Sequence, residues 1–174
     1  MPMEFAGADY LMLLAEVAVA LAGFTGVVTV FTRRSGDESL PSFKDTLAEY
    51  RLRMMLESAL MVLFFALLPF AFFAMDFPQD SFWILGSALF GVAILAWVLL
   101  QNRRLKRLKP KEKAGINPGM VWGLRVVSPA MAVVLILNSF QVILPGTAGA
   151  YIAVATYNIM VAGLAFLLLI FHTE

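Results

Sequence analysis

Five long apolar segments restrict this chain to a membrane fold more strictly than any other feature of its sequence. Each holds about twenty mostly apolar residues, enough helix to cross the roughly 30 Å hydrocarbon core of a bilayer. They are residues 10–31, 54–75, 82–100, 122–144 and 148–171. Because none alternates apolar and polar residues as a membrane β-strand does, we predict an all-α polytopic integral membrane protein with five transmembrane helices. No internal repeat divides the sequence, so residues 1–174 are interpreted as a single membrane domain.

The basic residues are concentrated in the connecting segments 32–53 and 101–121. The first segment carries five and the second seven of the 13 Lys and Arg residues, which leaves one elsewhere. Short cytoplasmic loops collect Lys and Arg, so we predict that both segments are cytoplasmic, with the N-terminus outside and the C-terminus in the cytoplasm. The segment AEVAVALAGFTGVV (residues 15–28) resembles the opening helix of small bacterial membrane proteins. This resemblance covers the first span alone. We predict a bacterial inner (plasma) membrane as the location of the protein.

The second and third helices are expected to extend into the cytoplasm beyond their apolar segments. Ser42 follows Pro41 as an N-cap, and no helix-breaking residue separates it from the second span. The third span continues without a break to Pro110. The two extensions, residues 43–53 and 101–109, are therefore predicted to lie antiparallel beside each other.

Two prolines lie inside the predicted spans. Pro69 removes the helical hydrogen bond to the carbonyl of Phe65, and Pro129 frees the carbonyl of Arg125. Helix kinks are expected at both positions.

The first span contains a carboxylate, Glu16, in an otherwise apolar segment. Its helix carries a stripe of small residues, in which Ala18, Ala22 and Gly26 recur every four residues and permit close approach of another helix. Glu16 lies beside this stripe and away from the bulky residues of the helix. Because ionisable side chains in a span usually face protein or a water-filled cavity, we expect Glu16 to face protein or a cavity rather than lipid.

Three further polar side chains lie in the last two spans: Asn138, Gln141 and Asn158. Asn138 and Gln141 are three residues apart, which predicts one shared helix face at a depth similar to that of Glu16. Two interpretations stay open for all four residues. They form hydrogen bonds between helices, typically worth about 0.6–2 kcal/mol each, or they line a path for protons or cations in an oligomeric pore.

A second pair of charges, Glu57 and Arg125, lies near the cytoplasmic ends of the second and fourth spans. An ion pair between them is the simplest arrangement, and it would anchor the helices or act as a gate. Two alternatives stay open. Arg53, four residues before Glu57, can be its partner, and Arg125 can extend toward the lipid headgroups.

A basic run follows the third span directly. We expect it to contact anionic lipids or a protein partner, because it carries no interleaved aromatic residues for binding nucleic acid. Its residues are Arg103, Arg104, Lys106, Arg107 and Lys109.

The sequence offers no recognisable catalytic or metal-binding set. It contains no cysteine and a single histidine, His172, so a His/Cys metal cluster cannot form within one chain. It also lacks a Ser/His/Asp set, an HExxH pattern and a Gly-rich phosphate loop. We predict a protein that is not an enzyme and that needs no metal or cofactor.

These features favour a small homo-oligomeric membrane protein, best interpreted as an ion-conducting channel or pore with Glu16 in its outer half. The alternative is a non-catalytic membrane scaffold or regulatory subunit that binds a protein partner through the cytoplasmic extensions. A proton-coupled transporter is the third hypothesis. It is less favoured because five spans without a repeat do not give the two-fold arrangement usual in transporters.

Overall fold

The structure, a computed structural model, describes residues 5, 7–34, 46–108, 116, 118–142 and 148–171. Three uninterrupted helices come first: α1 (Ala8–Arg34), α2 (Thr46–Ala74) and α3 (Gln79–Arg107). The fourth crossing has three parts: α5 (Pro118–Trp122), the π-helix η1 (Gly123–Val127) and α6 (Ser128–Ser139). The fifth is α7 (Ala148–Phe171).

The described part of the chain contains five helical segments long and apolar enough to cross a membrane. Each of them overlaps one of the five apolar segments of the sequence. The prediction of an all-helical protein with five potential spans is therefore confirmed.

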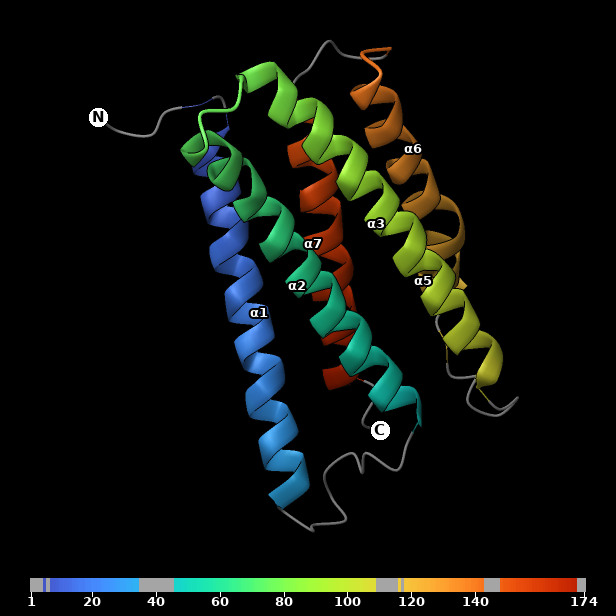
Figure 1. Ribbon diagram of the computed structural model, residues 1–174. Coiled ribbons are helices and arrows are strands. Elements are labelled where there is room, and N and C mark those ends of the chain that lie inside the picture. The colour runs from blue at the N-terminus through green and yellow to red at the C-terminus, as the bar shows by residue number, and fades with distance from the viewer. Residues whose placement is uncertain are drawn as a thin grey trace.

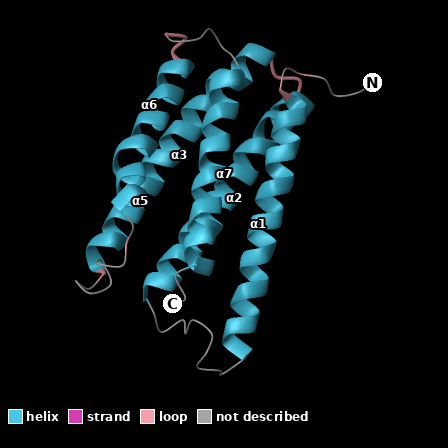
Figure 2. Ribbon diagram, turned by 180° about the vertical axis from the view of Figure 1, so that it is seen from behind, coloured by secondary structure: helices cyan, strands magenta, loops and turns pink. Residues whose placement is uncertain are grey.

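The crossings run up and down beside one another in a single bundle (Figures 1 and 2). α2 and α7 pack together in the middle, α1 covers them on one side, and α3 lies with α6 on the other. α1 makes its main contacts with α2 and α7, so it stands at an edge of the bundle with one long face uncovered. The start of α1 and the end of α7 lie at opposite ends of the bundle (Figure 1).

α2 and α3 are both longer than their apolar segments. α2 begins at Thr46, eight residues before the predicted span, and α3 continues to Arg107, seven residues beyond it. The predicted helical extensions therefore exist as helix over these residues. The proposed N-cap Ser42 lies outside the described residues.

α2 ends in a left-handed cap. Asp76 has a φ of 55°, and the amide of Phe77 donates to the carbonyl of Phe72 at 3.1 Å. This is a Schellman motif, which satisfies carbonyls that the helix end would leave unpaired. The rings of Phe72 and Phe77, 5.4 Å apart, supply the apolar contact that accompanies the motif.

α6 ends in the same way, which corrects the predicted position of Gln141. The φ of Gln141 is 59°. The backbone amide of Gln141 donates to the backbone carbonyl of Asn138 at 3.0 Å, and the backbone amide of Val142 donates to the backbone carbonyl of Leu137 at 3.1 Å. The fourth crossing therefore ends at Ser139 instead of residue 144. Gln141 is an exposed cap residue, and it does not share a helix face with Asn138.

Pro69 lies within α2 and has no amide hydrogen to donate to the carbonyl of Phe65. That carbonyl accepts a hydrogen bond from another donor. The hydroxyl of Tyr151, a fully buried residue of α7, donates to the carbonyl of Phe65 at 2.5 Å. The Tyr151 ring also contacts Trp83 and Phe90 of α3, with ring centroids 5.6 Å and 5.4 Å away. This hydrogen bond and its aromatic surroundings join the three helices near the end where α2 stops.

Candidate functional site

Glu16 lies exposed on the surface of the bundle. α1 packs against its neighbours through the other side of the helix, where Leu11, Leu14 and Ala18 are buried. We expected Glu16 to face protein or a cavity; no helix of its own chain covers it, because α1 is an edge helix and only one of its sides is packed. Within one chain, the carboxylate is turned away from the polar groups of the other spans.

Two glycines share the uncovered side of α1. Gly26 was expected to continue the packed stripe of Ala18, but it is exposed, and no neighbouring atom lies within 4 Å of the place that a Cβ would take. Gly23 is equally open. We name the strip of this surface that runs from Glu16 the α1 outer face; it comprises Glu16, Ala20, Gly23, Gly26 and Val27, and the exposed side chains of Met12, Leu13 and Val19 flank it.

Asn138 and Asn158 are both buried, but they do not meet. The side-chain amide of Asn138 donates to the hydroxyl of Ser87 at 3.1 Å, which joins α6 to α3. The amide of Asn158 donates to the carbonyl of Val154 at 3.0 Å, one turn earlier in its own helix. Among the described residues, these groups and Glu16 form no shared polar path. Asn138 thus has the role of an interhelical hydrogen bond, whereas Asn158 is satisfied locally.

Glu57 is bonded to α3, which corrects the simplest pairing expected from the sequence. Its carboxylate accepts hydrogen bonds from Arg104 Nη1 at 2.5 Å and from Gln101 Nε2 at 2.8 Å. α3 lies beside α2 at this end of the bundle and brings Arg104 to Glu57, so Arg125 is not its partner. Arg125 is exposed, and its Nε donates to Asn102 Oδ1 at 3.3 Å. Glu57 and Arg125 therefore do not form the predicted gate by direct contact.

The other two arginines at the start of α2 have different roles. Arg53 pairs with Glu49 at 2.6 Å, one turn earlier, and not with Glu57. Arg51 is buried, and its Nη1 donates to the carbonyl of Leu168 at 3.1 Å. That carbonyl belongs to the last turn of α7, where a cation complements the partial negative charge of a helix end.

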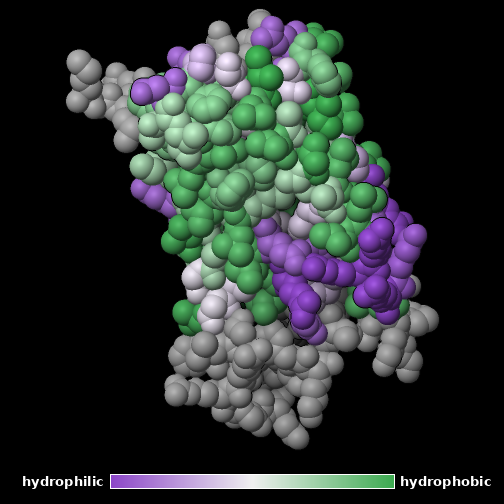
Figure 3. Space-filling view, in the orientation of Figure 1, coloured by the Kyte–Doolittle hydropathy of each residue, from purple (hydrophilic) through white to green (hydrophobic). Residues whose placement is uncertain are grey.

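The basic residues at the end of α3 differ in their surroundings: some are exposed, and one forms an ion pair with α2. Arg103, Lys106 and Arg107 are exposed, whereas Arg104 is half-buried beside Glu57. Lys109 lies outside the described residues. Figure 3 shows a hydrophilic surface where α2 begins and α3 ends, below a largely hydrophobic belt.

We expect Glu57→Ala to lower the free energy of unfolding in detergent by about 1–2 kcal/mol. The estimate lies between exposed and buried ion pairs, because the Glu57 and Arg104 side chains are 32% and 33% exposed. Glu49→Ala is the matched control, since its pair with Arg53 is more exposed and is expected to contribute less than about 0.5 kcal/mol. The free energy of unfolding is measured by denaturant titration. Equal losses in the two variants would show that the Glu57–Arg104 pair between α2 and α3 stabilises the protein no more than an exposed pair within one helix.

A polar cluster at the π-helix was not foreseen from the sequence. The carbonyl of Gly123 accepts the backbone amide of Ser128 and, at 3.3 Å each, the hydroxyls of Ser128 and Tyr157. The two hydroxyls are themselves 3.0 Å apart. Pro129, next to Ser128, was the available signal: a proline disturbs the helical ladder, and here the chain responds with a π-turn instead of a simple kink.

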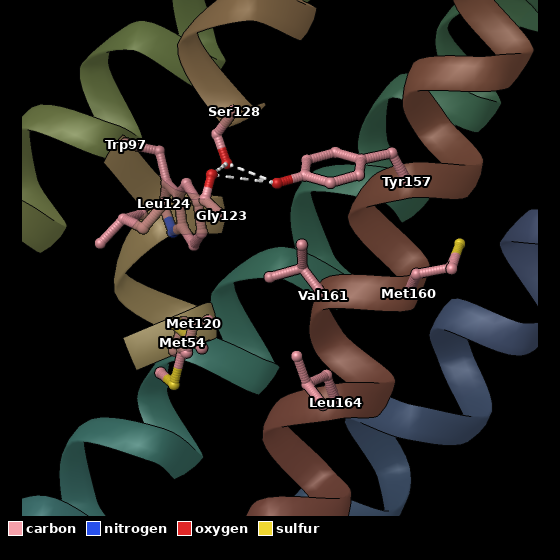
Figure 4. A pocket seen from close by; sticks show the side chains of 11 residues that line it. Met54, Trp97, Met120, Gly123, Leu124, Ser128, Tyr157, Met160, Val161 and Leu164 are labelled. Carbon is pink, nitrogen blue, oxygen red and sulfur yellow. Dashed lines mark hydrogen bonds between the residues drawn. The ribbon is translucent and has the colours of Figure 1, made fainter. Parts of the chain in front are cut away.

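This cluster forms part of the wall of a mainly apolar cavity of about 280 Å³ (Figure 4). The cavity lies between α7 and the fourth crossing, with Trp97 and Leu124 on one wall and Val161 and Leu164 on the other. Met160 and Leu164 are exposed, so the cavity lies beside the outer surface of the bundle. Its lining residues carry no charged side chain.

In the described part of the chain, no group of three or more His, Cys, Asp or Glu residues is placed to hold a metal ion. The polar groups instead form separate sites: the α1 outer face, the cluster at the π-helix and the charged end of α2 and α3. In comparisons with known proteins, no family model matches the chain, and neither does any curated protein or solved structure.

Proposed function

We propose that this chain is the subunit of a homo-oligomeric membrane pore that conducts cations, with Glu16 lining its outer half. The exposure of Glu16 within the potential span Ala8–Val28 is the observation that carries the proposal. An acidic side chain turned to lipid near the centre of a span costs about 2.5–3.5 kcal/mol on insertion scales. A neighbouring copy, or a water-filled path between copies, removes that cost.

The α1 outer face has the composition of a helix–helix contact. Glycine inside a helix costs roughly 0.5–1 kcal/mol relative to alanine, and within one chain nothing uses the space at Gly23 and Gly26. Small residues on a transmembrane helix allow a second helix to approach closely. A second copy of α1 would use this space and lie beside Glu16.

The position of the pore follows from the packing of the single chain. In the described bundle, the buried polar groups Asn138 and Asn158 are bonded separately, the first to Ser87 and the second within its own helix. A path for ions is therefore proposed between copies instead of through one bundle. A ring of Glu16 carboxylates around such a path attracts cations, as acidic rings do in cation channels.

The membrane orientation is part of the same proposal. The segments that carry the basic residues are placed in the cytoplasm by the positive-inside rule. In a bacterial inner membrane, the start of α1 then faces outward and the end of α7 faces the cytoplasm.

A single-cysteine experiment tests the subunit contact, because the sequence contains no cysteine. We expect Ala20→Cys, on the α1 outer face, to form disulfide-linked dimers in membranes under mild oxidation. Ala96→Cys is the matched control, since Ala96 is also exposed but lies on α3. Absence of cross-linking at residue 20, or equal cross-linking at both positions, would exclude α1 as the contact between copies.

A flux measurement tests the role of Glu16. In liposomes that contain the purified protein, we expect Glu16→Gln to abolish the preference for potassium over chloride. Asp9→Asn removes an exposed acid from the first turn of the same helix and is expected to change selectivity much less. If wild type conducts no ions, the pore proposal fails. If Glu16→Gln keeps the wild-type selectivity, Glu16 does not line the pore.

The competing proposal is a membrane scaffold that binds a protein partner through the end of α3. The exposure of Arg103 and Arg107 favours it. Reversing both charges is expected to abolish binding of a partner that co-purifies with the wild type. Arg104 is left out of this test because its bond to Glu57 makes its reversal a change in stability as well.

A further inference from the structure

Another, smaller and more open cavity lies between the first turns of α2 and the last turns of α3. Its volume is about 170 Å³. We name it the arginine cavity; its lining residues are Glu49, Tyr50, Arg53, Arg104, Arg107 and Leu108. The potential spans Glu49–Ala74 and Ser81–Arg107 both terminate here. Because its lining residues lie within eight residues of the apolar segments 54–75 and 82–100, the cavity is expected next to the lipid headgroups, at the membrane side of the cytoplasmic extensions.

The arginine cavity carries an excess of positive charge. Three arginines and one glutamate line it. Glu49 is held by Arg53 at 2.6 Å, and Arg104 uses its Nη1 on Glu57. Arg107 is exposed and forms no ion pair within the described residues. Because a guanidinium has five N–H donors, Arg53 and Arg104 keep donors beyond the ones that bind the two carboxylates.

Tyr50 adds a neutral donor to the same cavity. Its side chain is only 5% exposed, and among the described residues its hydroxyl has no hydrogen-bond partner. A buried hydroxyl without a partner is uncommon, since nearly all buried polar groups are paired. The hydroxyl itself is covered, so it reaches a ligand in the cavity only after the side chains around it move.

We infer that the arginine cavity binds the phosphate group of an anionic lipid. Phosphate oxygens accept hydrogen bonds from guanidinium groups in paired geometry, and the hydroxyl of Tyr50 supplies one more donor. The cavity is open on one side and has room for a phosphate group. The position at the ends of two spans favours a headgroup over a free phosphate ion.

This site involves a different and more specific set of residues than the lipid contact expected from the basic run of the sequence. Arg103 belongs to that run and is exposed, yet it does not line the cavity. Arg53 and Tyr50 do line it, although they belong to α2. Binding is thus assigned to a defined set of donors on two helices, and it does not depend on whether the protein conducts ions.

Native mass spectrometry of the full chain in neutral detergent tests the inference. Phosphatidylglycerol is titrated against phosphatidylcholine, and the fraction of protein with bound lipid is measured. We expect phosphatidylglycerol to bind more tightly, because the choline cation is repelled by the arginines. Arg107→Gln and Tyr50→Phe are each expected to weaken phosphatidylglycerol binding by about tenfold, as loss of a hydrogen bond to a charged group does.

Arg103→Gln is the matched control, with the same charge change on the same exposed end of α3. It is expected to weaken binding less than about twofold, as screened long-range charge does. Circular dichroism and gel filtration establish that each variant is folded. Equal losses in Arg103→Gln and Arg107→Gln would overturn the site, as would equal binding of the two lipids. If inorganic phosphate binds the protein as tightly as phosphatidylglycerol at equal concentration, the assignment to a lipid headgroup is overturned in favour of a free anion.

Discussion

Leucine in place of Gly91 is expected to destabilise the bundle more than any other single substitution considered for this chain. A Cβ at residue 91 would lie 2.9 Å from Ile136 Cγ1 and 3.0 Å from the carbonyl oxygen of Ala132. The Ile136 side chain can move, but the Ala132 carbonyl belongs to the backbone of α6. α3 and α6 would have to separate, and overpacking of this kind costs typically about 1–3 kcal/mol, occasionally more.

The unfolding midpoint of the purified protein in mixed detergent micelles measures this effect. Gly163→Leu is the matched control, because no neighbouring atom lies within 4 Å of the place that a Cβ would take at residue 163. It is expected to change the free energy of unfolding by less than about 0.5 kcal/mol. A Gly91→Leu variant with the wild-type midpoint would mean that α3 and α6 are not in close contact.

Removal of the Tyr151 hydroxyl is expected to have the second largest effect. Tyr151→Phe keeps the aromatic ring but leaves the buried carbonyl of Phe65 without its donor. An unsatisfied buried group of this kind costs about 1–3 kcal/mol. Tyr10→Phe is the control, since Tyr10 is 66% exposed and its hydroxyl is not part of the core.

The loss of unfolding free energy in Tyr151→Phe is expected to depend on Pro69. Pro69→Ala restores the backbone amide that reaches the carbonyl of Phe65 within a regular helix. In the Pro69→Ala background, Tyr151→Phe is therefore expected to cost at least about 1 kcal/mol less than in the wild type. A double-mutant cycle measures this difference. Additive losses would show that the proline and the tyrosine hydroxyl are independent.

The spans of this fold could be predicted from the sequence because they depend on one quantity, the length of apolar helix. The early start of α2 and the late end of α3 could be predicted in the same way, since no helix-breaking residue interrupts either segment. The end of α6 could have been predicted better, because Pro145 and Gly146 follow it closely. The predicted shared face of Asn138 and Gln141 required a helix that continues through residue 141, but α6 ends at Ser139.

The orientation of Glu16 could not be predicted from the helical pattern alone. The pattern places Glu16 away from Leu21 and Val28, but it does not say which side of the helix is packed, and Met12, Leu13 and Val19 share the exposed side of Glu16. Both large and small residues, such as Leu11 and Ala18, are buried in α1. Which side is covered depends on α1 being an edge helix, and that is a property of the whole bundle.

The partner of Glu57 was missed for a related reason. The sequence gives the depth of a charged residue in the membrane, and Glu57 and Arg125 have comparable depths. It does not give which helix lies beside which at that depth. The expected antiparallel contact between the ends of α2 and α3 already favoured a partner on α3, and Arg104 is that partner.

The central position of α7 sets the order in which this bundle can be assembled. α7 packs against α2 and α1, both of which are synthesised long before it. Until α7 has entered the membrane, Arg51 lacks the carbonyl of Leu168 and Tyr151 has not yet reached Phe65. The earlier helices can insert one by one, but the core that they share with α7 is complete only after α7, the last helix, has packed against them.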